Sequence, residues 1–342
     1  MKQAFVRIFI SIMLILIVLQ IVACSGVQVT TNTGSNTSNV GSDKNGAIKI
    51  AVVPKAVGAN YWEQVRLGAA CAASKQKNVT IQWDGVSAET DVTGQINLLT
   101  NFITQGVNGI VYAATDAKAL AQVTTKAINA KISVVNIDSG TTPQPANVPL
   151  FATDNVASAT RAADLLSTAL NGKGKIAFIP FLAGSATNDQ RASGFKTGLA
   201  KHPGLQLVAE QYSQSDTNTA LRVTEDILSA HPDITGIFAA NEPGVIGAAE
   251  AVQKAGKAGK VTIIGWDAAP DEIKDVQNGL ISALVVQNPF RMGYDSVNGI
   301  VSTIRGKAVS SEDTGVTFVT KSNINQAAVQ AVLNPSCAHP PL

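Results

Sequence analysis

Charged residues are scarce in this chain, and neither sign dominates. They make up 15% of the 342 residues, and 26 Lys and Arg stand against 24 Asp and Glu, for a formal net charge of +2. A protein that binds DNA or RNA needs a basic surface to neutralise phosphates. The charge balance therefore argues against nucleic acid as a partner.

Cysteine and histidine are rare as well, with three residues of each. His202 and His231 lie far from any cysteine in the sequence, and Cys337 with His339 forms an isolated pair, so we expect neither a zinc site nor a Cys-His nucleophile. We expect no metal and no other cofactor. Cys71 and Cys337 could form a disulfide in an oxidising compartment. Alternatively Cys71, which lies among alanines, is a small buried apolar residue, and this is the interpretation we favour.

Aromatic residues are also few, at 5%, whereas hydrophobic residues reach 45%. Abundant Ala, Val and Ile are typical of buried parallel strands that are covered by Ala-rich helices. A chain of this length suits two lobes of ordinary domain size. The composition therefore predicts an α/β protein with two lobes.

The first residues have the pattern of a targeting segment. Lys2 and Arg7 precede an apolar run over residues 8–23, and Cys24 follows directly. This arrangement resembles the lipobox of bacterial lipoproteins, in which the cysteine becomes a lipid-modified N-terminus. We expect a lipoprotein signal peptide at 1–23, a lipid anchor on Cys24 and a flexible Ser/Thr/Asn/Gly tether over 24–46. A plain transmembrane anchor or a conventional signal peptide is the alternative interpretation.

From residue 48 onward, short apolar runs alternate with amphipathic stretches, which predicts repeated βαβ units and parallel sheets. The first lobe should contain strands at 48–53, 79–83, 109–112 and 133–137, with a helix over 91–105. The second lobe should contain strands near 175–180, 205–210, 236–240 and 261–265. We expect each lobe to be a Rossmann-like unit.

Two segments resemble each other and indicate an internal duplication. The run from Gly109 leads one strand later to Asp138, and the run from Gly236 leads one strand later to Asp267. Ligands of open α/β sheets bind outside the carboxyl ends of the strands, so both aspartates should point into one cleft. A helix N-cap is the alternative role for each. We favour ligand contact for these two, and the cap role for Asp271.

Many segments, in the right order, resemble the type I periplasmic sugar-binding proteins of ABC importers, in the ribose, rhamnose and autoinducer-binding cluster. They are IAVVPKAVGANYW, WDGVSAETDVTGQINLLTNFITQGVNGIVYAATD, VVNIDSG, FATDN, NDQRASGF, FAANE, IIGWDAAPD and VVQNPFRMG. The first lobe resembles rhamnose-binding and autoinducer-binding proteins, and the second resembles ribose-binding proteins. The resemblance covers residues 48 to about 323 and implies a sugar receptor.

The resemblance also implies a set of ligand-binding residues. In the first lobe these are Lys55, Asn60, Tyr61, Trp62 and Asp138; in the second they are Asp189, Gln190, Arg191, Asn241, Asp267 and Gln287. Carboxylates, amides and cations can satisfy the hydroxyls of a neutral sugar, while an aromatic ring covers its C–H face. We expect one of Tyr61 and Trp62 to pack against the lobe and the other to form this face.

The family also implies how the lobes are divided and what partners they have. The first lobe should comprise 47–153 with about 289–315, and the second 154–288 with about 316–334. We expect a monomer that captures a pentose, hexose or deoxyhexose and delivers it to an ABC transporter permease. It should work at the extracytoplasmic face of the cell membrane or in the periplasm.

Three other functions remain as alternatives. One is binding of an autoinducer-type furanosyl signal or a polyol. Ala240, Asn241 and Glu242 replace residues typical of the autoinducer binders, which favours a simple sugar. A transcription regulator would need a helix-turn-helix ahead of Ile48, where the chain has the signal and tether. For an enzyme we find no Gly-x-Ser-x-Gly elbow, phosphate loop or zinc spacing, so we expect no enzymatic activity.

Overall fold

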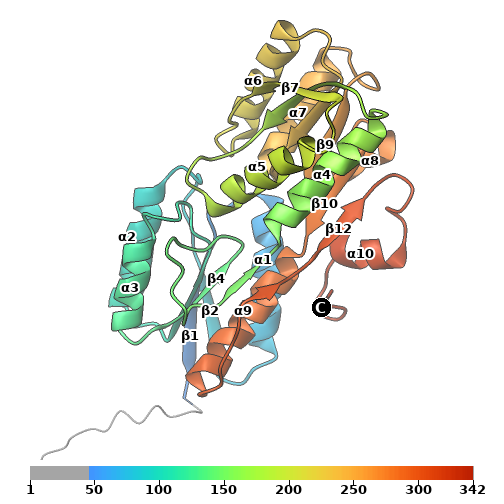
Figure 1. The fold of residues 1–342 in the computed structure, drawn as a ribbon. Helices are drawn as coiled ribbons and strands as arrows, with labels where there is room; N and C mark the ends of the chain where they lie inside the picture. The colour runs from blue at the N-terminus through green and yellow to red at the C-terminus, as the bar shows by residue number, and fades with distance from the viewer. Residues whose placement is uncertain (1–45, 342) are drawn as a thin grey trace, which may run out of the picture. The chain divides into compact units, whose positions relative to one another are not determined.

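The computed structural model describes residues 46–341. The predicted signal peptide, Cys24 and the tether up to residue 45 lie outside the described residues. The described part contains two six-stranded sheets flanked by helices (Figure 1). We call the sheet that contains β1, with its helices, the first lobe, and the other sheet, with its helices, the second lobe.

The first lobe is a fully parallel sheet in the order β11-β5-β4-β3-β1-β2. Its strands are β1 (Ile48–Val53), β2 (Val79–Trp83), β3 (Gly109–Tyr112), β4 (Ser133–Ile137), β5 (Leu150–Ala152) and β11 (Glu312–Asp313). Its helices are α1 (Asn60–Ser74), α2 (Val92–Thr104), α3 (Ala121–Asn129) and α9 (Pro289–Ile304).

The second lobe has the order β12-β10-β9-β8-β6-β7, in which only β12 is antiparallel to its neighbour. Its strands are β6 (Gly174–Ile179), β7 (Leu205–Glu210), β8 (Gly236–Ala239), β9 (Thr262–Trp266), β10 (Ala283–Gln287) and β12 (Val316–Val319). Its helices are α4 (Asn155–Ala169), α5 (Ala186–Leu199), α6 (Thr217–Ala230), α7 (Glu242–Lys254), α8 (Pro270–Asn278) and α10 (Ala327–Leu333).

Each sheet is buried on both faces, which explains the continuous apolar strands of the sequence. On β1, Ile50 and Val52 join a core with residues of α1 and α9, while Ala51 and Val53 join one with residues of α2 and α3. Successive side chains of a strand point to opposite faces, so one apolar run supplies two cores. The second lobe repeats this three-layer arrangement with α4 and α5 on one face and α6 and α7 on the other.

The structure confirms the predicted fold class and strands, with end shifts of one residue. The helix predicted over 91–105 is α2, which Asp91 caps by accepting a hydrogen bond from the amide of Gly94. The predicted N-cap role of Asp271 is wrong. Helix α8 begins at Pro270, which places Asp271 in its first turn, and the Glu272 carboxylate reaches back to the amide of Ala269.

The chain passes between the lobes three times: after β5, after β10, and between β11 and β12. The third crossing contains Gly315, whose φ of +78° suits a residue without a Cβ. All three lie between elements of different sheets, so they are the places where a change in lobe orientation would be absorbed.

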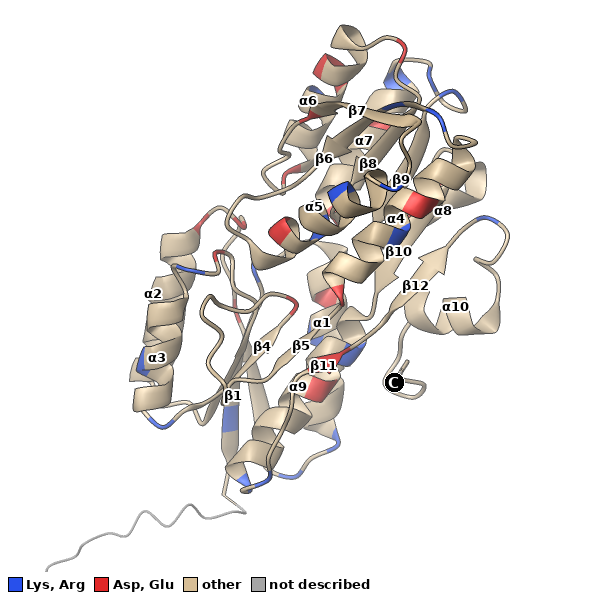
Figure 2. Cartoon of the chain, in the orientation of Figure 1, with Lys and Arg blue, Asp and Glu red and all other residues tan. Residues whose placement is uncertain are grey.

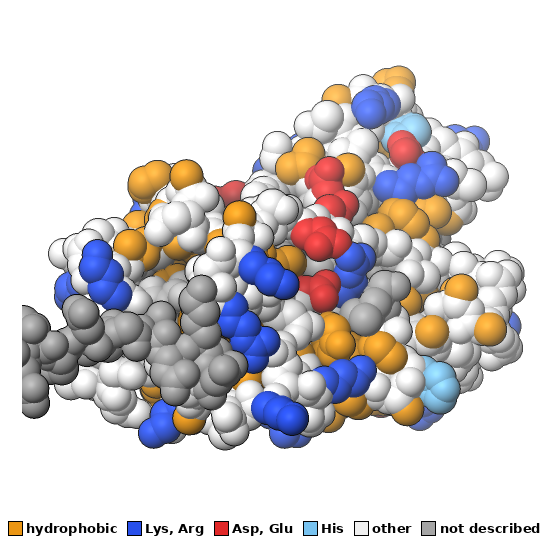
Figure 3. Space-filling model, turned by 90° about the horizontal axis from the view of Figure 1, so that it is seen from below, with side chains coloured by type: hydrophobic (Ala, Val, Ile, Leu, Met, Phe, Trp, Pro, Cys, Tyr) orange, Lys and Arg blue, Asp and Glu red, His pale blue; other side chains and the backbone are white. Residues whose placement is uncertain are grey.

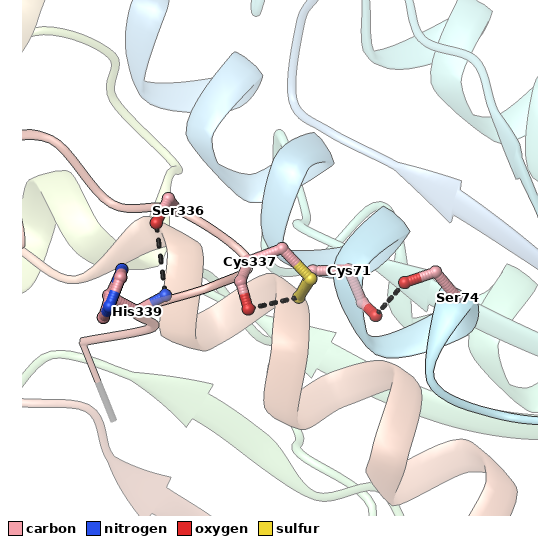
Figure 4. Close-up of a disulfide and its surroundings, with 5 residues drawn as sticks. All are labelled: Cys71, Ser74, Ser336, Cys337 and His339. Carbon is pink, nitrogen blue, oxygen red and sulfur yellow. Dashed lines mark hydrogen bonds between the residues drawn. A yellow bond between two sulfur atoms is a disulfide. The ribbon is translucent and has the colours of Figure 1, made fainter.

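A disulfide in the C-terminal segment makes a fourth connection between the lobes. Cys71 on α1 and Cys337 beyond α10 form a disulfide, with an S–S distance of 2.01 Å (Figure 4). The amide of Asn288 also donates a hydrogen bond to the carbonyl of Pro341. The favoured interpretation of Cys71 as a small apolar residue is therefore wrong. The sequence alone could not indicate this pairing, because it depends on where the C-terminal segment lies in the fold.

The charged residues are dispersed over both lobes (Figure 2). One face carries acidic side chains near its centre with basic side chains beside them (Figure 3). Within residues 46–341, no helix is both long enough and apolar enough to cross a membrane. In the same range, no cluster of three or more His, Cys, Asp or Glu side chains is arranged to hold a metal ion.

Candidate functional site: a polar pocket lined by both lobes

Residues from both lobes line a pocket of about 550 Å³, a size usual for small-molecule sites. Several follow the carboxyl ends of strands, where ligands of open α/β sheets bind. The first lobe contributes Lys55, Ala56, Val57, Gly58, Ala59, Tyr61, Trp62, Ser87, Ala88, Glu89, Thr90 and Asp138. The second contributes Phe181, Arg191, Gln214, Ser215, Asp216, Thr217, Asn241, Glu242, Pro243, Ile246, Asp267 and Gln287.

Asp138 is the polar centre of the first-lobe wall. It follows β4 with a φ of +54°, in the left-handed region. Its Oδ2 lies 2.7 Å from the Nζ of Lys55, and its Oδ1 accepts a hydrogen bond from the hydroxyl of Tyr61 at 3.1 Å. Burial is the main cause that raises the pKa of Tyr61 well above 10, so its hydroxyl stays protonated and can donate.

Lys55 and Arg191 connect this centre to the second lobe. Lys55 donates hydrogen bonds to the hydroxyls of Ser185 and Thr187, at 3.3 and 2.8 Å. The guanidinium of Arg191 lies 3.7 Å from Asp138 Oδ1 and 4.2 Å from the ring centroid of Trp266. Both cations are thus held by carboxylate, hydroxyl and aromatic partners, which offset the cost of their burial.

Asp267 is the corresponding acid of the second lobe. It follows β9 with a φ of +81°. Its Oδ1 accepts a hydrogen bond from the amide of Gln287 at 2.8 Å, and its Oδ2 accepts one from the backbone amide of Glu242 at 3.2 Å. Burial is the largest cause that raises its pKa from 3.8 to about 7, while Arg191 opposes the shift.

Asn241 and Glu242 stand at the start of α7. The Oδ1 of Asn241 caps the helix by accepting a hydrogen bond from Gly244, and its Nδ2 donates one to Ser215. The carboxylate of Glu242 reaches the first lobe, where its two oxygens accept hydrogen bonds from the backbone amides of Asn60 and Tyr61, both at 2.9 Å. Burial raises the pKa of Glu242.

Three aromatic side chains line the pocket. Tyr61 and Trp62 are both buried and meet edge to face, with ring centroids 4.8 Å apart. The sequence predicts that only one of them forms the pocket wall, but both line it. Phe181 joins them from the second lobe, beneath the cations of Lys55 and Arg191.

Eight of the eleven predicted ligand-binding residues line this pocket, and three do not. Asn60 contributes its backbone amide to Glu242 and lines a smaller neighbouring cavity. Asp189 and Gln190 are exposed and line a separate cavity. Successive residues of a helix point about 100° apart, so Arg191 can face the pocket while the two residues before it do not. Gln190 accepts a hydrogen bond from Asn155, which in turn holds Arg191.

Sequence reasoning missed Glu89, Phe181, Glu242 and the loop of residues 214–217. Glu89 and Phe181 come shortly after β2 and β6, so the rule that ligands bind at the carboxyl ends of strands could have suggested both. Glu242 directly follows the predicted Asn241. The loop carries two successive left-handed residues, Gln214 and Ser215, which no sequence pattern indicated.

Comparison with known proteins places this architecture in a family. Residues 50–308 match the model of the periplasmic binding protein domain, so the chain belongs to that family. The family consists of solute-binding receptors of transporters. The prediction of a type I periplasmic binding protein, made from the order of the sequence motifs, is confirmed.

Relatives in sequence and in structure agree with this assignment. The D-allose-binding periplasmic protein of Escherichia coli is 30% identical over 271 residues, which are 77% of this chain and 87% of that protein. An ABC transporter solute-binding protein from Agrobacterium vitis, solved with D-fucose, is 38% identical with a TM-score of 0.82, covering 83% of this chain and 99% of that one. A carbohydrate transporter solute-binding protein from Agrobacterium radiobacter, solved with D-arabinose, is 31% identical with a TM-score of 0.81, covering 84% and 99%.

Proposed function

We propose that this protein is the receptor of an ABC importer and captures a monosaccharide between its two lobes. The observation that carries the proposal is the pocket itself, in which buried carboxylates, amides and cations from both lobes stand beside aromatic rings. A monosaccharide presents hydroxyls that both donate and accept hydrogen bonds, together with apolar C–H surface, and this wall can satisfy both kinds of group.

The eight predicted residues that line the pocket are proposed to contact the sugar. Asp138 and Asp267, one from each lobe, would accept hydrogen bonds from different hydroxyls, and Asn241 and Gln287 would complete the second-lobe side. Lys55 and Arg191 would donate hydrogen bonds to hydroxyl oxygens of the sugar. A sugar that touches both lobes favours the closed arrangement by its differential affinity, and a permease would recognise that arrangement.

The relatives support this ligand class. Proteins that bind D-allose, D-fucose and D-arabinose share the chain's family and its fold. These three sugars differ in ring substituents, so the relatives support a monosaccharide without selecting one. We further propose that the protein has no hydrolytic activity, because its family consists of solute-binding receptors and the carboxylates of Asp138 and Asp267 would serve as acceptors for sugar hydroxyls.

A sugar screen tests the proposal. We expect one or more of D-allose, D-ribose, D-arabinose, D-fucose, D-tagatose and xylitol to raise the melting temperature, because a ligand that binds only the folded state stabilises it by mass action. Titration calorimetry on each sugar that gives a shift should yield one site per chain. If no pentose, hexose, deoxyhexose or polyol binds, the proposal is wrong.

We also propose that a lipid on Cys24 anchors the protein at the extracytoplasmic face of the membrane. The support is the basic, apolar and cysteine-ending pattern of residues 1–24. With Cys24→Ser, we expect the protein to lose incorporation of radiolabelled fatty acid and to leave the membrane fraction. Cys71→Ser serves as the thiol control and should remain membrane-bound. Equal labelling of the wild type and Cys24→Ser would contradict the anchor.

A further inference from the structure

Glu89 lies in the pocket wall but is not among the residues that the family resemblance implies. It sits in the loop between β2 and α2, next to Trp62, whose indole nitrogen lies 3.4 Å from Glu89 Oε1. Its other oxygen, Oε2, is buried and has no hydrogen-bond partner among the described residues. Leaving a buried acceptor unpaired is unfavourable, and more so when it is charged. A donor supplied by a ligand would remove that cost.

The other buried carboxylates of the pocket differ from Glu89 in this respect. Asp138 has Lys55 on one oxygen and Tyr61 on the other. Both oxygens of Asp267 accept hydrogen bonds, and both oxygens of Glu242 accept backbone amides. Within the described pocket wall, Glu89 is thus the acid whose buried oxygen has neither a hydrogen bond nor an ion pair.

Glu89 lines the pocket together with a loop of the second lobe. Across from its loop, the second lobe presents Gln214 and Ser215, which are both held in left-handed backbone conformations. The Ser215 hydroxyl accepts a hydrogen bond from Asn241, and it also lies close enough to Glu89 to oppose the rise in the pKa of Glu89 that burial causes. Left-handed conformations of residues other than glycine cost energy and cluster at ligand sites.

We propose that Glu89 determines specificity in this pocket: its Oε2 accepts a hydrogen bond from one sugar hydroxyl that the protein's other acids do not bind. This inference rests on the proposed monosaccharide function and adds a third acid to its site. A pocket built to bond a hydroxyl discriminates strongly against an analogue that lacks it, because the pocket oxygen is then left unpaired. The protein should therefore bind one monodeoxy form of its sugar poorly, because that form lacks the hydroxyl that donates to Glu89.

The test combines variants of Glu89 with deoxy analogues. Calorimetry is run on the wild type and Glu89→Gln with the tightest-binding sugar of the screen and with each of its monodeoxy forms. We expect Glu89→Gln to lose at least about tenfold in affinity for the parent sugar. One monodeoxy form lacks the hydroxyl that donates to Glu89. The wild type and Glu89→Gln should bind that form with equal affinity, since neither can make this hydrogen bond.

Controls separate this inference from structural damage and from the proposed function. Glu63→Gln changes an acid on the outward side of α1 and should bind like the wild type. Glu89→Asp keeps the charge but retracts the oxygens, so it supplies a second variant if Glu89→Gln does not fold. Unchanged affinity in these variants, or an equal loss for every deoxy form, overturns the role of Glu89. Failure of the wild type to bind any sugar overturns the proposed function instead.

Discussion

At the scale of single residues, Asp138 and Asp267 share an unusual backbone. Both follow a parallel strand and both have a positive φ, of +54° and +81°. Aspartate tolerates this region better than most residues, although it still costs energy. The strain is offset by the hydrogen bonds that fix each carboxylate in the pocket wall. The internal duplication in the sequence is thus matched by a shared local geometry.

The buried carboxylate of Asp267 predicts a pH dependence of stability. In the folded protein the carboxyl group of Asp267 keeps its proton up to about pH 7, whereas in the unfolded chain it releases the proton near pH 3.8. The free energy of unfolding therefore falls as pH rises between these values. Asp267→Asn removes this titration, so its melting temperature relative to the wild type should increase from about pH 5 to about pH 8.

Thermal unfolding without sugar across this range measures the effect. Arg191, Gln287, Glu242 and Asp138 surround the carboxylate in both the wild type and the variant, so the difference between the two isolates Asp267. Asp226→Asn, an exposed substitution on α6, is the matched control and should show no such trend. If the difference in melting temperature between the wild type and Asp267→Asn does not vary with pH, the raised pKa of Asp267 is contradicted.

At the scale of elements, the N-terminus of α1 has an unusual cap. The position before the helix is Ala59, which has no side chain to cap it. The first free amides instead bond to Glu242, which stands at the start of α7 in the other lobe. A carboxylate is favourable at a helix N-terminus because it meets both free N–H groups and the positive end of the helix dipole. This cap exists only while the lobes hold the present arrangement.

Removing the charge of Glu242 should therefore weaken closure. A helix cap contributes about 0.5–2 kcal/mol, and sugar affinity scales with the fraction of molecules in the binding-competent state. We expect Glu242→Gln to bind sugar several-fold to tenfold more weakly and to have a larger radius of gyration in solution scattering without ligand. Glu250→Gln, exposed on the same helix, should change neither quantity. An unaltered radius of gyration together with unaltered affinity would count against the cap.

At the scale of the whole molecule, the disulfide joins the lobes independently of the three crossings. Cys337 follows α10, which packs against β12 of the second lobe, whereas Cys71 belongs to α1 of the first. The two cysteines are 266 residues apart, so the bond closes nearly the whole described chain. It should stabilise the fold and limit how far the lobes can separate.

Replacing both cysteines tests this role. We expect Cys71→Ser with Cys337→Ser to lower the free energy of unfolding by about 2–4 kcal/mol and to widen the range of lobe separations seen by solution scattering. A reductant should reproduce the loss of stability in the wild type and have no further effect on the double variant. Equal stability of the oxidised wild type and the double variant would show that the bond does not constrain the fold.

The sequence by itself determined the α/β class, the strands and the placement of acids at strand ends. These follow from local patterns, because apolar periodicity and the carboxyl-end rule depend on neighbouring residues. The tertiary structure alone decided that Cys71 meets Cys337, that Glu242 caps a helix 182 residues earlier, and that Glu89 and Phe181 share a pocket. It also decided that Asp189 and Gln190 face away from that pocket. Such contacts depend on how two lobes and a chain end come together, which no local pattern encodes.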